Sequence, residues 1–255
     1  MRGRGAVYRA DPRFSVVGHR LSTIDRIIVV ASPKGGVGKT LVSTLAALAA
    51  AGKGLEAGLL DLDLTNPCTH VVLGVDPGLA LVEEEKGVVP PRVHGVSYMT
   101  IAFFTGGRGL ALRGPEATNV ILEVLAVTRW PRLNILFVDT PPGIRDEVLD
   151  VLNIASSVHR DTRVLVVTTP SRLAVEAAGR LLDVLRDGGF NVAGLVENMA
   201  RPGGSPVDEL AAAKGVDVLA RIPYDPSVEE HLGNPSALLK TRAGRAVEQL
   251  LGKLF

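Results

Sequence analysis

The chain has 255 residues, of which 46% are hydrophobic, and its formal net charge is +1. This length and apolar content are enough for one large domain, while the near-neutral charge gives no reason to expect a nucleic acid partner. The single cysteine excludes an intramolecular disulfide, and we find neither an apolar run long enough for a membrane span nor an apolar signal core. We therefore expect a soluble, cytoplasmic protein for which neither membrane nor nucleic acid is the favoured partner.

Residues 1–25 are rich in arginine and show no clear helical period. Such a segment could contact phosphates or an acidic partner. More often it is a flexible or loosely docked tail. We expect a basic N-terminal arm over residues 1–25, followed by a single folded domain over residues 26–255.

The first strand of that domain is predicted over residues 27–31, and an Ala/Leu-rich helix over residues 41–50. Between them lies the loop SPKGGVGKT, so that strand, glycine-rich loop, Lys-Thr and helix follow in the order of a phosphate-binding loop. Glycines let several N–H groups point into one concavity, to which the helix dipole adds. The residues expected to bind the nucleotide here are Lys34, Gly35, Gly36, Val37, Gly38, Lys39, Thr40 and Leu41. Lys39 is expected at the β- and γ-phosphates, and the Thr40 hydroxyl on Mg²⁺.

A second strand is predicted over residues 55–62, and it leads into Asp61 and Asp63. Carboxylates at the carboxyl end of a central strand lie where open α/β sheets bind ligands. Because successive side chains of a strand point to opposite faces, Asp61 and Asp63 lie on the same side if the strand stays extended. One is expected to hold the loop near Mg²⁺ and the other to orient the attacking water, with capping of the next element as the alternative. Cys68 and His70 follow; two ligands do not make a metal site, so Cys68 is expected to be a small buried hydrophobe.

Further along, residues 97–103 predict a strand, and the tripeptide RGP at 113–115 opens a predicted helix. A buried strand over residues 133–138 ends at Asp139 in the motif DTPPG. An acid in this position holds Mg²⁺ directly or through water, and Gly143 offers a backbone hinge near the γ-phosphate. Three spaced motifs in this order predict an ATPase.

The alternation continues with a strand at 163–170, a helix at 171–187 and a strand at 191–196. It predicts an α/β fold, doubly wound, with a mostly parallel sheet and helices on both faces. Residues 236–255 show apolar residues at helical spacing with only a moderately basic polar face. We therefore expect this last helix to dock onto its own domain, with membrane binding as the alternative.

The loop KGGVGKT, with its second lysine at Lys34, resembles the deviant Walker A loop of the MinD/ParA superfamily of ATPases. RGP and DTPPG are similar to the same motifs in the Mrp/Nbp35 branch, the iron–sulfur cluster carriers, and the resemblance covers roughly residues 26–250. It implies slow hydrolysis of ATP to ADP by a homodimer that closes on nucleotide. It also implies that Lys34 crosses to the partner's phosphates and that Asp63 is the hydrolytic acid. Lys34, Lys39 and Asp63 are then the catalytic residues, and Thr40, Asp61 and Asp139 the magnesium site.

Two further segments resemble the adenine side of these ATPases. They are ENM at residues 197–199 and IPYDP at residues 222–226. The implied contacts to the base come from Asn198, Pro223, Tyr224 and Asp225. An asparagine amide suits contact with a base because it donates and accepts hydrogen bonds at once.

The chain departs from the Mrp/Nbp35 carriers at residues 200–206, where ARPGGSP stands in place of the C-x-x-C that holds their bridging 4Fe–4S cluster. A cubane needs about four thiolates, and a dimer of this chain offers one Cys68 from each subunit. An iron–sulfur cluster is therefore not expected at the usual site. Three uses of the ATPase remain open: an accessory factor in iron–sulfur assembly, a MinD/ParA-like positioning ATPase at membrane or DNA, and a switch for another target protein.

Overall fold

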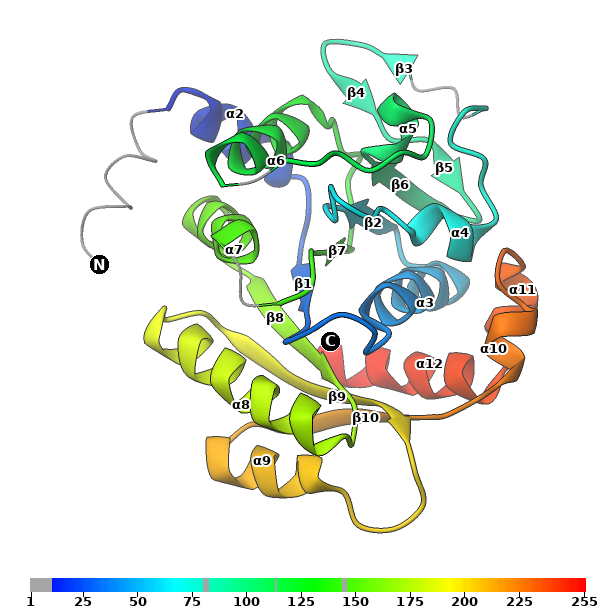
Figure 1. Cartoon of the computed structure of the whole chain (residues 1–255). Helices are drawn as coiled ribbons and strands as arrows, with labels where there is room; N and C mark the ends of the chain where they lie inside the picture. Colours follow the sequence, from blue (N-terminus) through cyan, green and yellow to red (C-terminus); the bar gives the residue numbers. More distant parts are fainter. Residues whose placement is uncertain (1–10, 80–82, 113, 144–145) are drawn as a thin grey trace.

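A computed structural model describes residues 11–79, 83–112, 114–143 and 146–255. Within them one large sheet of eight strands has the order β10-β9-β8-β1-β7-β2-β6-β5 (Figure 1). Every pair of neighbours is parallel except β5 and β6. The strands are β1 (Ile27–Ala31), β2 (Ala57–Asp61), β5 (Arg92–Val93), β6 (Val96–Thr100), β7 (Ile135–Asp139), β8 (Thr162–Thr168), β9 (Val192–Ala200) and β10 (Val218–Pro223). The predicted mostly parallel α/β sheet is confirmed.

Helices cover both faces of this sheet (Figure 1). They are α2 (Arg13–Leu21), α3 (Lys39–Gly52), α4 (Thr69–Leu73), α5 (Ala102–Thr105), α6 (Pro115–Val127), α7 (Asp146–Val158), α8 (Arg172–Asp187), α9 (Pro206–Lys214), α10 (Ser227–Glu230), α11 (Pro235–Leu238) and α12 (Arg242–Leu254). A separate pair of short strands, β3 (Glu83–Glu84) and β4 (Val88–Val89), lies outside the main sheet.

The central strand β1 feeds two separate cores. Ile27 and Val29 join the core formed with α2, α6, α7 and α8, while Ile28 and Val30 join the core formed with α3 and α12. All five residues of β1 are buried, as are those of β2 and β7. A strand covered on both faces has no solvent side, which explains its continuous apolar sequence.

The parallel register brings the two magnesium candidates of the central strands together. Asp61 ends β2 and Asp139 ends β7, and the two residues are direct partners across the strand pair. Strand β1, which leads into the glycine loop, lies on the other side of β7. The three motifs therefore meet at the carboxyl edge of the sheet, where open α/β folds bind ligands.

The basic arm differs from the expectation. Residues 13–21 form helix α2, with Val17 and Leu21 buried in the core and Phe14 packed against it. These apolar side chains are spaced three and four residues apart and so share one helix face. Arg20 anchors the helix by donating to the backbone oxygens of Ala126 and Lys86. This part of the arm is packed structure; residues 1–10 lie outside the described residues.

Several further boundaries move, and the largest change is at β9: the strand predicted over residues 191–196 runs to Ala200 and so includes residues 197–199. The strand expected over residues 97–103 ends at Thr100, and α5 begins at Ala102. The strand expected to reach residue 62 ends at Asp61.

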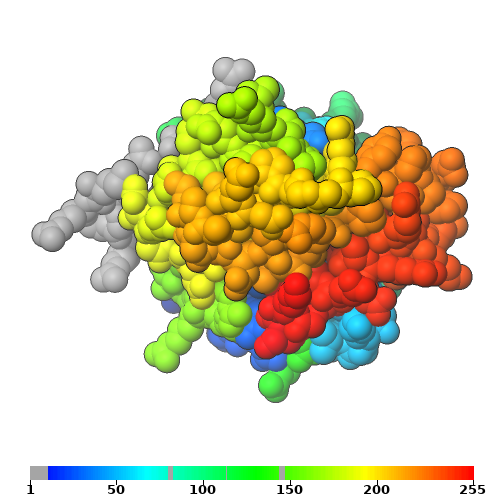
Figure 2. Space-filling view, turned by 90° about the horizontal axis from the view of Figure 1, so that it is seen from below, coloured from blue at the N-terminus to red at the C-terminus, as the bar shows by residue number. Residues whose placement is uncertain are grey.

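The C-terminal helix docks on its own domain, as expected. Leu250, Leu251 and Leu254 of α12 are buried in the core shared with α3. Figure 2 shows this red helix lying flush against the orange segments before it. No helix in the described part of the chain is both long and apolar enough to span a membrane.

Candidate functional site

The glycine loop after β1 presents a row of free donors. Within the described residues, no acceptor binds the backbone N–H groups of residues 35–41, and the start of α3 has no side-chain cap. Gly36 and Gly38 have φ values of 79° and 85°, a conformation that glycine adopts readily and other residues rarely do. These N–H groups lie at the positive end of a 14-residue helix. Such an arrangement is typical of anion-binding sites.

Three side chains from the start of α3 converge on Asp139. Lys39 Nζ lies 2.7 Å from Oδ1, Thr40 Oγ1 donates to Oδ2 at 2.8 Å, and Ser43 Oγ donates to Oδ1 at 3.0 Å. Lys39 is 6% exposed and Asp139 is 1% exposed. Buried charges persist only when they are paired in this way. The predicted phosphate lysine and the predicted magnesium acid are thus direct partners.

Ser43 was not among the sequence candidates. It is fully buried, and its hydroxyl also reaches the carbonyl of Thr40 at 3.0 Å. The signal was present in the sequence, because a residue three or four positions after Lys39 and Thr40 lies on the same helix face.

Asp61 lies deep in the same edge. Its carboxylate accepts hydrogen bonds from the hydroxyl and backbone N–H of Thr69, at 2.6 and 3.3 Å. The Thr69 hydroxyl also bonds the Tyr98 hydroxyl at 2.6 Å. Burial, and after it the negative charge of Asp139, raises the pKa of Asp61 to about 7. A nearby cation would reverse this shift.

Asp63 does not share a strand face with Asp61, because β2 ends before it. The chain turns, so that the backbone N–H of Asp63 donates to Asp61 Oδ1 at 3.0 Å. Its own Oδ1 accepts from the Thr65 hydroxyl at 2.9 Å and the Asn66 N–H at 3.1 Å. The side chain is 7% exposed. The turn gives Asp63 a fixed position one step beyond the buried pair.

On the adenine side, Asn198 reaches the glycine loop itself. Its Nδ2 donates to the Val37 carbonyl at 2.8 Å, and the residue is 4% exposed. Asp225 stabilises its own loop, because its carboxylate accepts from Ser227 and from the backbone N–H of Arg242. The Ser227 hydroxyl is the main cause that lowers the pKa of Asp225. Contacts of Asp225 to a base remain a prediction.

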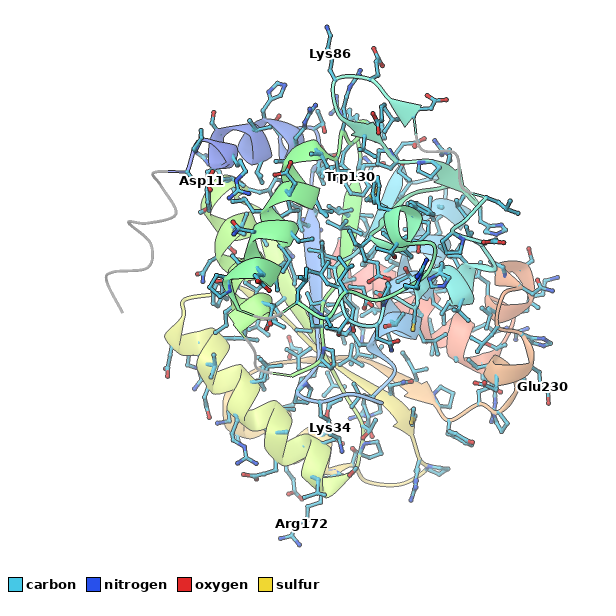
Figure 3. All side chains as sticks on the ribbon, turned by 45° about the horizontal axis from the view of Figure 1, so that its top comes forward. Asp11, Lys34, Lys86, Trp130, Arg172 and Glu230 are labelled. Carbon is cyan, nitrogen blue, oxygen red and sulfur yellow. The ribbon has the colours of Figure 1, made fainter. Side chains whose placement is uncertain are left out.

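Pro223 ends β10 and the Tyr224 ring beyond it is 62% exposed. Lys34 is also exposed. Figure 3 places Lys34 toward the end of the molecule from which Arg172 projects at the start of α8.

Cys68 precedes helix α4 and is only partly buried. Its pKa is raised by burial and then by the charges of Asp61, Asp63 and Asp139. A raised pKa disfavours the thiolate form that binds metals. Among the described residues, no group of three or more His, Cys, Asp or Glu side chains is arranged to hold a metal ion.

Comparison with known proteins gives consistent relatives. The model of a family described as ParA, NUBPL iron-transfer P-loop NTPase, matches residues 23–255. An iron-sulfur cluster carrier protein of Pseudomonas fragi is 34% identical over 239 residues, covering 86% of this chain and 80% of the relative. The cytosolic Fe-S cluster assembly factor NUBP2 of Bos taurus is 35% identical over 231 residues, covering 83% of this chain and 84% of the relative.

Solved structures show the same fold. The nucleotide-binding protein of Archaeoglobus fulgidus in complex with ADP has a TM-score of 0.71 at 24% identity and covers 92% of both chains. The cell division ATPase MinD of Pyrococcus furiosus has a TM-score of 0.65 at 22% identity, covering 90% of this chain and 98% of its own. Family model, relatives and fold agree with the loop at residues 34–40 and the DTPPG motif: this chain belongs to the NUBPL iron-transfer P-loop NTPases.

Proposed function

We propose that this chain binds ATP with Mg²⁺ on residues 34–41 and hydrolyses it slowly to ADP. In this proposal, nucleotide opens and closes a homodimer that serves iron–sulfur assembly. The observation that carries the proposal is the row of N–H groups over residues 35–41, which have no acceptor among the described residues, beside the buried ammonium of Lys39. Unpaired donors and a positive charge are what a polyphosphate chain requires.

The residues also fit a magnesium ion. Mg²⁺ prefers oxygen ligands and is usually bound by one or two carboxylates together with substrate phosphates. Thr40 Oγ1 and Asp139 Oδ2 lie 2.8 Å apart, and Asp61 is the strand partner of Asp139. These three residues would hold the ion, which neutralises charge on the β- and γ-phosphates when bound.

Each remaining residue has a role that its position supports. Lys39 leaves Asp139 and binds the phosphates. Asp63 orients the attacking water, since its turn holds it just beyond the buried Asp61. The exposed Lys34 reaches the nucleotide of the other subunit, because Lys39 already serves its own.

The relatives named above are cluster carriers and assembly factors, but this chain has one cysteine. Residues 200–206 hold no thiol, and a cubane cluster needs about four ligands. We therefore propose an accessory role, in which the cluster is held by other proteins and this chain supplies the nucleotide-dependent change of shape.

Binding is tested with Lys39→Ala and a matched control. Calorimetry with Mg·ATP should show loss of binding, because truncating one partner of a buried charge contact costs about 2–5 kcal/mol. Lys53→Ala should bind normally, since Lys53 is exposed at the far end of α3 and pairs with Glu248. Normal binding by Lys39→Ala would refute the site.

The dimer and the cargo are tested separately. Light scattering with ATP should show a dimer for Asp63→Ala, in which blocked turnover traps the closed state, and a monomer for Lys34→Ala. Anaerobic addition of iron and sulfide to the wild type should give no cluster absorbance. A strictly monomeric Asp63→Ala with ATP would refute the switch, and a cluster formed by this chain alone would refute the accessory role.

A further inference from the structure

The end of strand β9 makes a direct contact with the phosphate loop. Asn198 is 4% exposed, and its Nδ2 donates to the carbonyl of Val37 at 2.8 Å across 161 residues of chain. The Asn198 amide also packs closely on Gly38, the residue after Val37. A Cβ on Gly38 would lie 2.1 Å from Nδ2, which excludes any side chain there without movement of the amide.

Asn198 is itself held firmly on its strand. The preceding residue, Glu197, is 1% exposed, and its carboxylate accepts from Ser205 Oγ at 2.7 Å and from Arg221 Nε at 3.0 Å. Strand β9 pairs with β8 on one side and β10 on the other. The Asn198 amide therefore projects from a strand that pairs with β10 at this residue, and side chains on strands are held more precisely than side chains on loops.

We infer that Asn198 is a positioning residue that holds the phosphate loop in its binding shape; this inference rests on the proposed nucleotide site. The peptide group between Val37 and Gly38 is trans and planar, so its C=O and N–H point in opposite directions. Binding the Val37 oxygen to Asn198 turns the Gly38 N–H away from Asn198. That N–H belongs to the row of donors at residues 35–41 for which the described part of the chain supplies no acceptor.

The same amide retains capacity for a base. Asparagine has two N–H donors and one carbonyl acceptor, and the contact to Val37 uses one donor. Two roles of Asn198 can therefore be told apart with a ligand that has no base. If Asn198 only contacts the base, its loss leaves binding of such a ligand unchanged; if it positions the loop, its loss weakens that binding. Inorganic tripolyphosphate is such a ligand, because it offers the phosphate chain alone.

The test measures affinity for tripolyphosphate and for ATP, both with Mg²⁺, in wild type, Asn198→Asp and Asn198→Ala. Asn198→Asp keeps the shape but removes the donor, and Asn198→Ala removes the donor without adding charge. We expect both ligands to lose about tenfold in affinity in both variants, which corresponds to about 1.4 kcal/mol. Tripolyphosphate affinity within threefold of wild type in either folded variant would overturn the inference.

Two controls separate this result from other failures. Asn134→Asp changes an amide just before β7, at the amino ends of the parallel strands, where Asn134 accepts from the Glu56 N–H and donates to Asp25. This variant should leave the affinities for tripolyphosphate and ATP unchanged. Thermal unfolding of each variant identifies a temperature at which the variant is folded, and the affinities are measured there. If Asn198 only stabilised the fold, its substitution would lower the unfolding midpoint without changing the affinity of the folded protein. Wild type that binds neither ligand would refute the nucleotide site itself.

Discussion

Asp139→Asn probes the central feature of the site, the competition between a carboxylate and a nucleotide for one lysine. Lys39 Nζ is 2.7 Å from Asp139 Oδ1, with both side chains buried. A phosphate must compete with this carboxylate for the Lys39 ammonium group. Removing the charge of Asp139 should therefore favour binding of a nucleotide that arrives without metal.

The magnitude follows from the burial of the pair. Deleting one partner of a buried ion pair costs about 3–5 kcal/mol, because the other charge is left uncompensated. A bound triphosphate supplies a new counter-charge to Lys39, so the bound state of Asp139→Asn is spared much of this cost. Recovery of only about 1.4 kcal/mol corresponds to tenfold tighter binding. We expect at least this gain for ATP in the absence of Mg²⁺.

The assay is calorimetric titration of ATP in the presence of a chelator, combined with urea unfolding of the ligand-free protein. Asp139→Asn should be less stable than wild type yet bind metal-free ATP at least tenfold more tightly. With Mg²⁺ the advantage should disappear, because the variant lacks a carboxylate of the magnesium site.

Asp161→Asn is the matched control. Asp161 precedes β8 at the amino ends of the parallel strands, away from the nucleotide site, and pairs with Arg26 at 2.8 Å and with Arg163 at 2.7 Å. This variant should lose stability and leave metal-free ATP binding unchanged. Unchanged or weaker metal-free binding by Asp139→Asn itself would refute the competition.

Three further predictions concern hydrolysis, the N-terminal helix and acid stability. Asp63→Ala should bind Mg·ATP normally but lose phosphate release in a steady-state assay; normal turnover there, with loss in Asp61→Ala, would reverse the two roles. Leu21→Ala should lower the free energy of unfolding in urea by about 2–5 kcal/mol, since this side chain is 1% exposed in the core; a loss below about 1 kcal/mol would show that α2 is not part of the cooperative unit. Partial burial raises the pKa of Asp161, but hydrogen bonds from Arg26 and Arg163 outweigh burial, so this pKa lies below the ordinary 3.8. The stability that Asp161 adds is therefore present above pH 3.8 and is lost as the pH falls through the pKa of the folded state. The unfolding curves of wild type and Asp161→Asn should converge in acid, and a constant difference between them would contradict the pairing.

The sequence by itself determined the parts of this protein that are contiguous. A β-branched run, a glycine loop, Lys-Thr and an Ala/Leu-rich helix specify a phosphate loop because each step depends only on its neighbours. The alternation of strands and helices likewise determined a mostly parallel sheet, since parallel neighbours need a crossover between them. Family membership followed from the same local motifs.

The tertiary structure decided which side chains meet. Lys39 and Asp139 are 100 residues apart, and Asn198 and Val37 are 161 apart. Their contacts depend on the order β9-β8-β1-β7-β2, and local periodicity carries no information about strand order. The turn that separates Asp63 from Asp61, and the burial of α2 against α6, were decided in the same way. In each case the partner that a polar or apolar side chain finds depends on which element the fold places beside it, and that placement minimises the free energy of the whole domain rather than of one segment.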